Sequence, residues 1–334
     1  MKIKLTISPI LHIFVTIFLV SCFNSTVDEY PDHYLDDWQL YSLENKDIGV
    51  FSLHPINTDI VYAGGTELLI TINDGQTWDT LFTENESRDI KISTDNIIYY
   101  ATYGLFKSTD GGVIWNAINP TFPEEAIFTC FDIDPDNNDI IYVGCGGPTG
   151  GALYKSINGG IDWSQINTEE MFGSIKKLVV NPNNTDIVYA SVAGEGLLFK
   201  TKNKGRTWIQ MDIGIEDLAY DFNDIFCDPL DNSTTYIVSR SIFKTDNNGR
   251  SWEDISEGIL ENSTINNITG TNNGRLFVST RTSLYEFIHE SESWTKISND
   301  SLNLIINDIK CSENTNKLFI GTDKGIYTIN LLHE

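Results

Sequence analysis

Seven tryptophans recur along this chain at nearly constant intervals, and the sequence contains no other tryptophan. Intervals of 40, 37, 48, 45, 44 and 42 residues separate Trp38, Trp78, Trp115, Trp163, Trp208, Trp252 and Trp294. Another 40 residues follow the last tryptophan. A fixed period of this length indicates a repeat architecture, in which each unit buries its apolar face against its neighbours.

Each repeat also contains strand-forming runs. In the third repeat, residues 128–133, 139–143 and 153–155 are β-branched and aromatic runs bounded by Asn, Asp, Pro and Gly, and a fourth run surrounds Trp163. Four strands in about 43 residues match the size of one β-propeller blade. We therefore predict an all-β fold of four-stranded antiparallel blades.

The two ends of the chain predict the number of blades. Residues 304–330 supply three strands of a last blade, whereas residues 36–41 contain a tryptophan strand with no blade before it. If this N-terminal strand around Trp38 joins the C-terminal blade, the ring closes and no sheet edge stays open at the seam. We predict a single seven-bladed β-propeller over residues 36–334, with no second domain.

A short motif ends at five of the tryptophans. It occupies residues 71–78, 108–115, 156–163, 201–208 and 245–252, whereas residues 287–294 keep only its final Ser-Trp. The motif resembles the Asp-box, or BNR, repeat with the pattern S/T-x-D/N-x-G-x-S/T-W, and the resemblance covers essentially the whole mature chain. Its positions here are Asn73, Gly75, Trp78, Asp110, Gly112, Trp115, Asn158, Gly160, Trp163, Asn203, Gly205, Trp208, Asn247, Gly249 and Trp252.

The physical chemistry of this motif is that of a turn. Its Asp or Asn side chain accepts hydrogen bonds from the backbone of the turn, and its Gly supplies a positive φ. The hydroxyls tie the two strands of the hairpin together, and the tryptophan lays an apolar face across the sheet. We predict a structural rather than a catalytic role for these residues.

The first 21 residues have the features of a targeting segment. Lys2 and Lys4 form a short positive region, and the apolar run over residues 10–20 is too short to span a bilayer. The run ends in Leu-Val-Ser-Cys22, which resembles a bacterial lipobox. The resemblance implies cleavage before Cys22 and lipid attachment to its thiol, with several acyl chains giving stable membrane anchoring. The alternative is an ordinary secreted protein with a chance cysteine at the cleavage site.

Residues 22–35 are then the lipidated cysteine and a polar tether. The second residue after cleavage is Asn24, not Asp, which favours the outer membrane in bacteria that sort lipoproteins by this position. We expect a cell-envelope protein at that membrane. The sequence leaves open whether the protein faces the periplasm or the outside.

Charge restricts the partners. Asp and Glu total 47 against 22 Lys and Arg, which gives a formal net charge of -25. Such a surface repels phosphate backbones, so we predict no nucleic-acid partner. It leaves cationic ligands or basic protein patches as partners, or a solvated acidic surface that keeps the protein soluble. We expect a monomer.

The cysteines and histidines form no catalytic or metal-binding pattern. Cys227 and Cys311 fall at equivalent inner-strand positions, as small core residues. Cys130 and Cys145 lie on adjacent strands of one blade. The sequence leaves open whether they form a disulfide or remain two free thiols. His54 precedes a proline and is expected in a turn. We predict no metal site, no cofactor and no Ser/His/Asp or Cys/His catalytic arrangement.

Three cations mark the expected mouth of the central channel. Arg240, Arg281 and Lys324 occupy second-to-third strand loops of three consecutive blades. They form either a carboxylate- or sulfate-binding patch or three separate solvated charges. They are the candidate ligand-binding residues.

Asp-box propellers include sialidases, xyloglucan-active hydrolases, sortilin-type receptors and photosystem II assembly factors. The Arg-Ile-Pro motif of sialidases is absent, and xyloglucanases work between two propellers, of which this chain has one. The assembly factors share a single, often lipid-anchored ring, although their ligand surfaces are basic. The resemblance implies a non-catalytic binding or assembly scaffold for an envelope protein or a glycan.

The alternative is a glycan-active enzyme, either a glycoside hydrolase or a polysaccharide lyase, with unrecognised catalytic residues. Paired carboxylates can act on a glycosidic bond, and adjacent acidic residues on a loop are otherwise simply solvated. The candidates on blade-to-blade loops are Glu124, Glu125, Glu169 and Glu170. A non-catalytic binding scaffold agrees better than an enzyme with the absence of a recognisable catalytic pattern in the sequence. The fold alone does not decide between the two functions.

Overall fold

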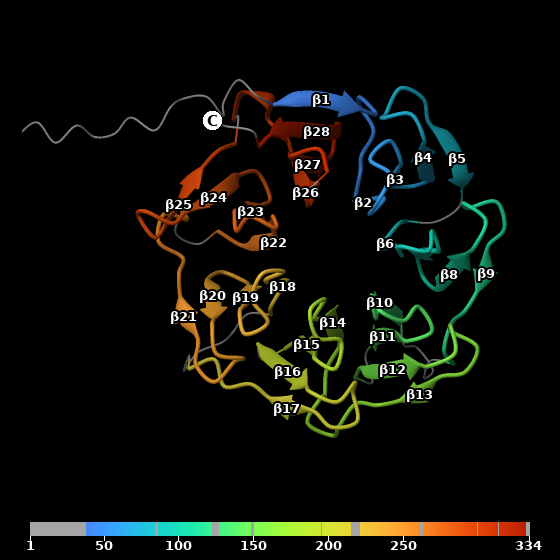
Figure 1. Cartoon of the computed structure of the whole chain (residues 1–334), viewed down its shortest axis with the longest axis vertical. Coiled ribbons are helices and arrows are strands. Elements are labelled where there is room, and N and C mark those ends of the chain that lie inside the picture. The colour runs from blue at the N-terminus through green and yellow to red at the C-terminus, as the bar shows by residue number, and fades with distance from the viewer. Residues whose placement is uncertain are drawn as a thin grey trace, which may run out of the picture.

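The computed structural model of the chain describes residues 38–331, except residues 84–85, 122–126, 148–149, 195, 215–220, 261–262, 299 and 313. Seven four-stranded antiparallel sheets surround a common axis (Figure 1). The predicted all-β, seven-bladed propeller is confirmed. The signal segment, Cys22 and the tether lie outside the described residues. Within the described residues, no helix is both long enough and apolar enough to cross a membrane.

Blades are numbered along the chain, and their strands are given from the innermost to the outermost. Blade 1 consists of β2 (Val50–Leu53), β3 (Val61–Gly64), β4 (Leu68–Thr71) and β5 (Asp79–Phe82). Blade 2 consists of β6 (Asp89–Ile92), β7 (Ile98–Ala101), β8 (Leu105–Ser108) and β9 (Asn116–Ala117). Blade 3 consists of β10 (Ile127–Ile133), β11 (Ile141–Gly146), β12 (Ala152–Ser156) and β13 (Ser164–Gln165). Blade 4 consists of β14 (Ile175–Val180), β15 (Val188–Val192), β16 (Leu197–Thr201) and β17 (Ile209–Gln210). Blade 5 consists of β18 (Asp224–Cys227), β19 (Thr235–Val238), β20 (Ile242–Thr245) and β21 (Glu253–Asp254). Blade 6 consists of β22 (Ile265–Gly270), β23 (Leu276–Thr280), β24 (Leu284–Ile288) and β25 (Ser293–Lys296). Blade 7 consists of β26 (Ile306–Ser312), β27 (Lys317–Thr322), β28 (Gly325–Asn330) and β1 (Gln39–Ser42). A short 3-10 helix, η2 (Asp300–Leu302), precedes blade 7.

The antiparallel order of each blade gives the ring two distinct faces. One face, here called the turn face, carries the first-to-second and third-to-fourth strand turns. The opposite face, here called the loop face, carries the second-to-third strand loops and the connectors between blades. The innermost strands β2, β6, β10, β14, β18, β22 and β26 line the centre of the ring (Figure 1).

The N-terminal strand closes the ring as predicted. In blade 7, β1 pairs antiparallel with β28, with Gln39 opposite Thr328 and Leu40 opposite Tyr327. The Trp38 ring lies 6.3 Å from the Tyr327 ring, and its indole N–H donates to the Ile297 carbonyl of blade 6 at 3.1 Å. Residues from the two ends of the described chain therefore complete one sheet.

The apolar core is divided among the interfaces between blades. At the seam, Phe51 and Val61 of blade 1 pack with Phe319 and Ile326 of blade 7. Each of the other six interfaces holds a buried cluster that likewise draws on both neighbouring blades. Because a single blade leaves two apolar faces uncovered, its stability depends on its neighbours and on closure of the ring.

The outer strands begin later than the sequence predicts. In six of the seven blades the strand starts one residue after the tryptophan. Blade 6 differs because its motif is lost. There a tight hairpin pairs Ile288 with Ser293, so that Trp294 lies inside β25 and is only 3% exposed.

The four cysteines of the described residues are free. Cys130 is opposite Gly144 and Cys145 is opposite Phe128, because the register shifts between β10 and β11. Cys130 packs in the interface with blade 4, whereas Cys145 packs with Trp163. The two thiols therefore belong to different clusters and form no disulfide.

We expect Trp38→Ala to lower the free energy of unfolding by about 2 kcal/mol, because it removes a large half-buried ring between blades 6 and 7. Leu40→Ala, on the same strand at 41% exposure, should cost well under half as much. Urea denaturation followed by circular dichroism measures both. Equal losses for the two variants would contradict the role assigned to Trp38.

We also expect stability to fall above pH 10. Burial raises the pKa of Tyr62 to about 12 and raises the pKa of Tyr99 and Tyr189 in the same direction. Above pH 10 the unfolded chain releases these phenol protons while the folded chain keeps them, so the unfolded state gains stability.

Tyr62→Phe provides the control for this effect. Between pH 10 and 12 it should lose less stability than the unchanged protein, by about 1 to 2 kcal/mol. Urea denaturation at several pH values makes the measurement. Parallel pH curves for the two proteins would refute the assignment to Tyr62.

Candidate functional site

The five turns that carry the motif, here called the rim turns, use their polar groups internally. In the first, the Thr71 hydroxyl oxygen accepts the Gly75 N–H at 3.0 Å, and the Asn73 carbonyl oxygen accepts the Thr77 N–H at 2.9 Å. In the second, the Ile114 N–H and the Ser108 hydroxyl hold the pKa of Asp110 below its ordinary value. These groups are occupied within the turn and are poorly placed for catalysis.

The glycines of the rim turns meet two requirements at once. Gly112 has a φ of 93°, a conformation that other residues adopt with strain. A Cβ at the same position would approach the Leu81 side chain of blade 1 to 2.6 Å. In the third blade, the Trp163 indole N–H donates to the Ile118 carbonyl of blade 2 at 2.9 Å. Each rim turn therefore packs against the outer strand of the preceding blade.

A second link between blades comes from lysines that the sequence analysis treated only as strand residues. The Lys200 ammonium lies 4.9 Å from the centre of the Tyr189 ring and donates to the Asn248 carbonyl of the next blade at 3.1 Å. Burial lowers the pKa of Lys200 to about 8. Lys155 repeats the arrangement over Tyr142 in the preceding blade. The signal in the sequence is the recurrent lysine two residues after Leu or Ile at the start of the third strand.

Carboxylates on the inner strands form a third kind of link. Asp132 accepts the Val180 N–H of the next blade at 2.7 Å and pairs with Lys91 of the previous blade at 2.9 Å. Asp224 pairs with Lys177 at 2.8 Å. Burial lowers the pKa of Lys177, but Asp224 and other inner-strand carboxylates raise it by more, so the net shift is upward. These charges neutralise one another.

The three predicted ligand-binding cations occupy the expected loops of blades 5, 6 and 7. Arg281 lines a loop-face pocket of about 650 Å3 between blades 6 and 7, and neither Arg240 nor Lys324 is among its lining residues. The Lys324 ammonium donates to the Leu302 and Asn303 carbonyls at 3.2 and 2.8 Å. Arg281 thus lines a pocket, whereas the Lys324 ammonium is engaged by backbone carbonyls.

The candidate acid–base residues divide between described and undescribed segments. Glu124 and Glu125 lie outside the described residues. Glu169 and Glu170 are exposed, and the Thr168 hydroxyl holds the pKa of Glu170 below its ordinary value. A general acid for glycoside cleavage needs a raised pKa. Glu170 therefore lacks that property.

The residues that the structure describes contain no group of three or more metal-ligating side chains.

A pocket of about 620 Å3 on the loop face is lined mainly by polar and acidic residues, and we call it the acidic pocket. Three segments build it: the connector from blade 7 to blade 1, the second-to-third loop of blade 1, and the connector from blade 1 to blade 2. Its lining consists of residues 45–49, residues 65–67, Leu69, Glu86 and Ser87. The pocket at Arg281 is built in the same way, from the second-to-third loop of blade 6 and the connectors on its two sides.

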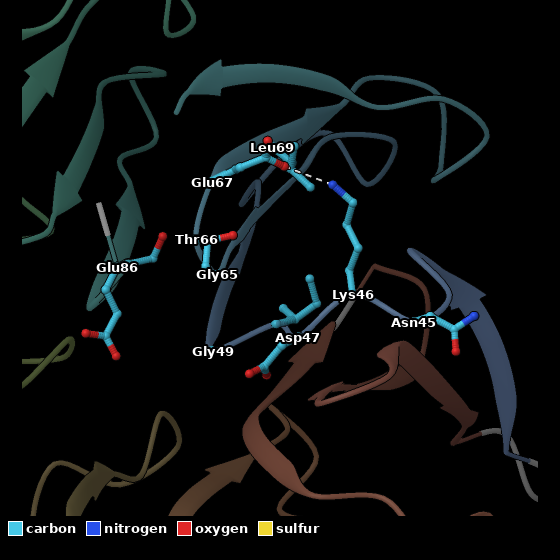
Figure 2. A pocket seen from close by; sticks show the side chains of 11 residues that line it. Asn45, Lys46, Asp47, Gly49, Gly65, Thr66, Glu67, Leu69 and Glu86 are labelled. Carbon is cyan, nitrogen blue, oxygen red and sulfur yellow. Dashed lines mark hydrogen bonds and ion pairs between the residues drawn. The ribbon is translucent and has the colours of Figure 1, made fainter. Parts of the chain in front are cut away.

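Three carboxylates and one ammonium set the charge of the acidic pocket. Lys46 pairs with Glu67 at 2.9 Å, and Asp47 accepts a hydrogen bond from the Asn307 amide at 3.0 Å. Figure 2 shows the Lys46 ammonium directed at Glu67, whereas the Asp47 and Glu86 side chains lie away from that pair. Two carboxylates are therefore left without a cationic partner inside the pocket, which suits a positively charged group.

No motif or repeat position in the sequence marks Asp47, Glu67 or Glu86. Twenty residues separate the first two, and nineteen more separate the second two. The available signal was the acidic character of the loops around blade 1. The fold of blade 1 brings the three loops together: the Gly49 N–H donates to the Gly64 carbonyl, and the Ser87 N–H donates to the Gly65 carbonyl, both at 2.9 Å.

Comparisons with known proteins agree on the fold. No protein-family model matches the chain, and no curated protein matches it. Among solved structures, YCF48 from Cyanidioschyzon merolae is 16% identical, with 88% of this chain and 98% of that chain covered and a TM-score of 0.67. YCF48 bound to D1 peptide is 14% identical, with 89% and 96% covered and a TM-score of 0.65. The GH74 xyloglucanase from Xanthomonas campestris is 14% identical, with 88% and 53% covered and a TM-score of 0.67. At these identities the likeness shows the fold alone.

We expect Asn203→Ala to lower the free energy of unfolding by about 1 to 2 kcal/mol, because its amide is hydrogen-bonded to Thr201 on one side of the rim turn of blade 4 and to Thr207 on the other. Asn203→Asp keeps the oxygen acceptor and should stay within about 0.5 kcal/mol of the unchanged protein. Thermal and urea unfolding test both variants. A loss as large in Asn203→Asp as in Asn203→Ala would contradict the turn role.

Proposed function

We propose that this chain is a lipid-anchored cell-envelope protein that binds a polypeptide ligand on the loop face of its propeller, without catalysis. The observation that carries the proposal is the acidic pocket. It lies where two connectors and a strand loop converge, and it offers two carboxylates with no cationic partner in the pocket. A lysine- or arginine-containing segment provides the complementary charge.

The chemistry of the chain supports a basic polypeptide over an anionic ligand. The net charge of -25 attracts cationic partners over long range and repels polyanions. The only lysine of the pocket already pairs with Glu67. The similar propeller YCF48 has been solved bound to D1 peptide, which supports a polypeptide as the class of ligand.

The membrane attachment is a second part of the proposal. The short apolar run and the lipobox support cleavage after residue 21 and lipid attachment to Cys22. Asn24 supports sorting to the outer membrane. The propeller then acts as a tethered binding module, held to the bilayer by residues 22–35.

A defined pair of probes tests the binding. A fluorescent decapeptide rich in lysine and arginine should bind the full chain, and its glutamate-rich counterpart should not. We expect Asp47→Asn/Glu67→Gln/Glu86→Gln to weaken binding of the basic peptide at least tenfold, because the carboxylates supply the attraction. Fluorescence anisotropy at two salt concentrations measures the affinities, and salt should weaken the interaction.

The matched control removes the same number of charges elsewhere. Asp136→Asn/Glu169→Gln/Glu170→Gln changes three exposed carboxylates outside the acidic pocket. It should leave affinity within about twofold, since only the long-range field changes. Equal weakening by the two triple variants, or equal binding of the acidic and basic peptides, would show that the pocket is not the site.

A further inference from the structure

The pocket that Arg281 lines, here called the arginine pocket, adjoins the acidic pocket. Asn307, the second residue of β26, lines the arginine pocket. Its amide donates at 3.0 Å both to the Asp47 carboxylate and to the Ile48 carbonyl, and Asp47 and Ile48 line the acidic pocket. The two pockets therefore meet at one side chain, and a polypeptide segment of a few residues is long enough to reach both.

The Arg281 backbone is fixed, whereas its guanidinium is left available. Arg281 and Thr282 form the tip of the tight turn from β23 to β24, in which the Thr280 N–H donates to the Ser283 carbonyl at 2.8 Å. The Ile306 N–H of blade 7 donates to the Arg281 carbonyl at 2.8 Å. Arg281 is exposed and forms no ion pair with a carboxylate of the described residues. Its five N–H donors can therefore serve a ligand.

Hydroxyl and amide side chains surround Arg281 in its pocket. They belong to Ser263, Thr264, Asn266, Thr280, Thr282 and Asn307. Within the part of the chain that the structure describes, no carboxylate and no second cation lines this pocket. A guanidinium donates two parallel hydrogen bonds to a carboxylate, and hydroxyls and amides supply further donors around it. The arginine pocket is therefore suited to a carboxylate.

We propose that the arginine pocket binds an acidic side chain of the same polypeptide whose basic side chain enters the acidic pocket. The inference rests on the proposed function and deepens it, because it assigns a second charge of opposite sign to the ligand. The partner is a polypeptide segment that carries a lysine or arginine and, a few residues away, an aspartate or glutamate.

The charge of the chain favours such a segment over an anionic glycan. A polyanion that reaches Arg281 also meets the neighbouring acidic pocket and a protein of net charge -25, and both repel it. In a segment with both charges, each charge faces a group of opposite sign. The adjoining pockets therefore select for the order and spacing of the two charges and not for net charge alone.

A third pocket continues the row away from the acidic pocket. It has a volume of about 390 Å3, shares Thr282 and Ile306 with the arginine pocket, and is also lined by Trp38, Leu260 and Leu304. The three pockets follow one another over blades 6, 7 and 1 on the loop face. A row of adjoining pockets suits an extended chain with separate side chains better than one compact small molecule.

Fluorescence anisotropy of designed peptides on the full chain tests the proposal. Each peptide carries a pair of lysines and, across a glycine-serine spacer of two to eight residues, either a pair of glutamates or a pair of glutamines. Both orders of the two pairs are made. At the best spacing the glutamate peptide should bind about fivefold more tightly than its glutamine counterpart, the gain of one exposed ion pair.

Arg281→Gln should reduce this preference to less than about twofold, because it removes the partner of the glutamates. Arg250→Gln is the matched control, since Arg250 is an exposed arginine on the rim turn of blade 5, on the opposite face. It removes the same charge and should keep the preference. Both arginines are exposed, so both variants should fold.

Three results overturn the proposal. The first is no preference for the glutamate peptide at any spacing, and the second is an equal loss of preference in Arg281→Gln and Arg250→Gln. The third is binding of oligogalacturonate that is tighter than that of any glutamate peptide and is lost in Arg281→Gln, which would assign the arginine pocket to an anionic glycan.

The glutamine peptide keeps the two proposals distinguishable. If it binds and Asp47→Asn/Glu67→Gln/Glu86→Gln weakens its binding, the acidic pocket stands, and a missing preference for glutamate refutes only the arginine pocket. If the glutamine peptide does not bind, the proposed function fails, and the arginine pocket fails with it as a part of the same site.

Discussion

Burial of apolar surface between blades is the interaction on which the rest of this structure depends. Every blade interface contains a buried cluster contributed by both neighbours, so no blade can bury its faces alone. Blade 7 is the one blade that the chain does not build from four consecutive strands. There β1 adds to β28, and at the interface with blade 1 Phe51 packs with Phe319, far from it in the chain.

Polar links at three radii reinforce the same interfaces. Near the centre, Asp132 accepts a backbone N–H from the next blade. Further out, Lys200 reaches from the Tyr189 ring to a carbonyl of the next blade. At the circumference, Trp163 donates to the preceding blade. These groups satisfy one another across the interfaces between blades.

The two faces of the ring suit different tasks. The acidic pocket opens on the loop face, whereas Trp38, the first described residue, lies at the turn-face end of β1. Antiparallel pairing forces this separation, since the strand loops and blade connectors must lie opposite the hairpin turns.

The sequence by itself determined the blade count, the closure by Trp38 and the turn character of residues such as Asn73 and Gly75, because these follow from periodicity and local hydrogen bonding. It also placed Arg281 and Lys324 on the correct loops, but it gave no account of their partners. Only the tertiary structure decided that Lys324 is bound by backbone carbonyls, that Cys130 and Cys145 belong to different clusters, and that Asp47, Glu67 and Glu86 share one pocket. The physical reason is that periodicity fixes which element a residue belongs to, whereas the twist, the register shift and ring closure fix which side chains meet.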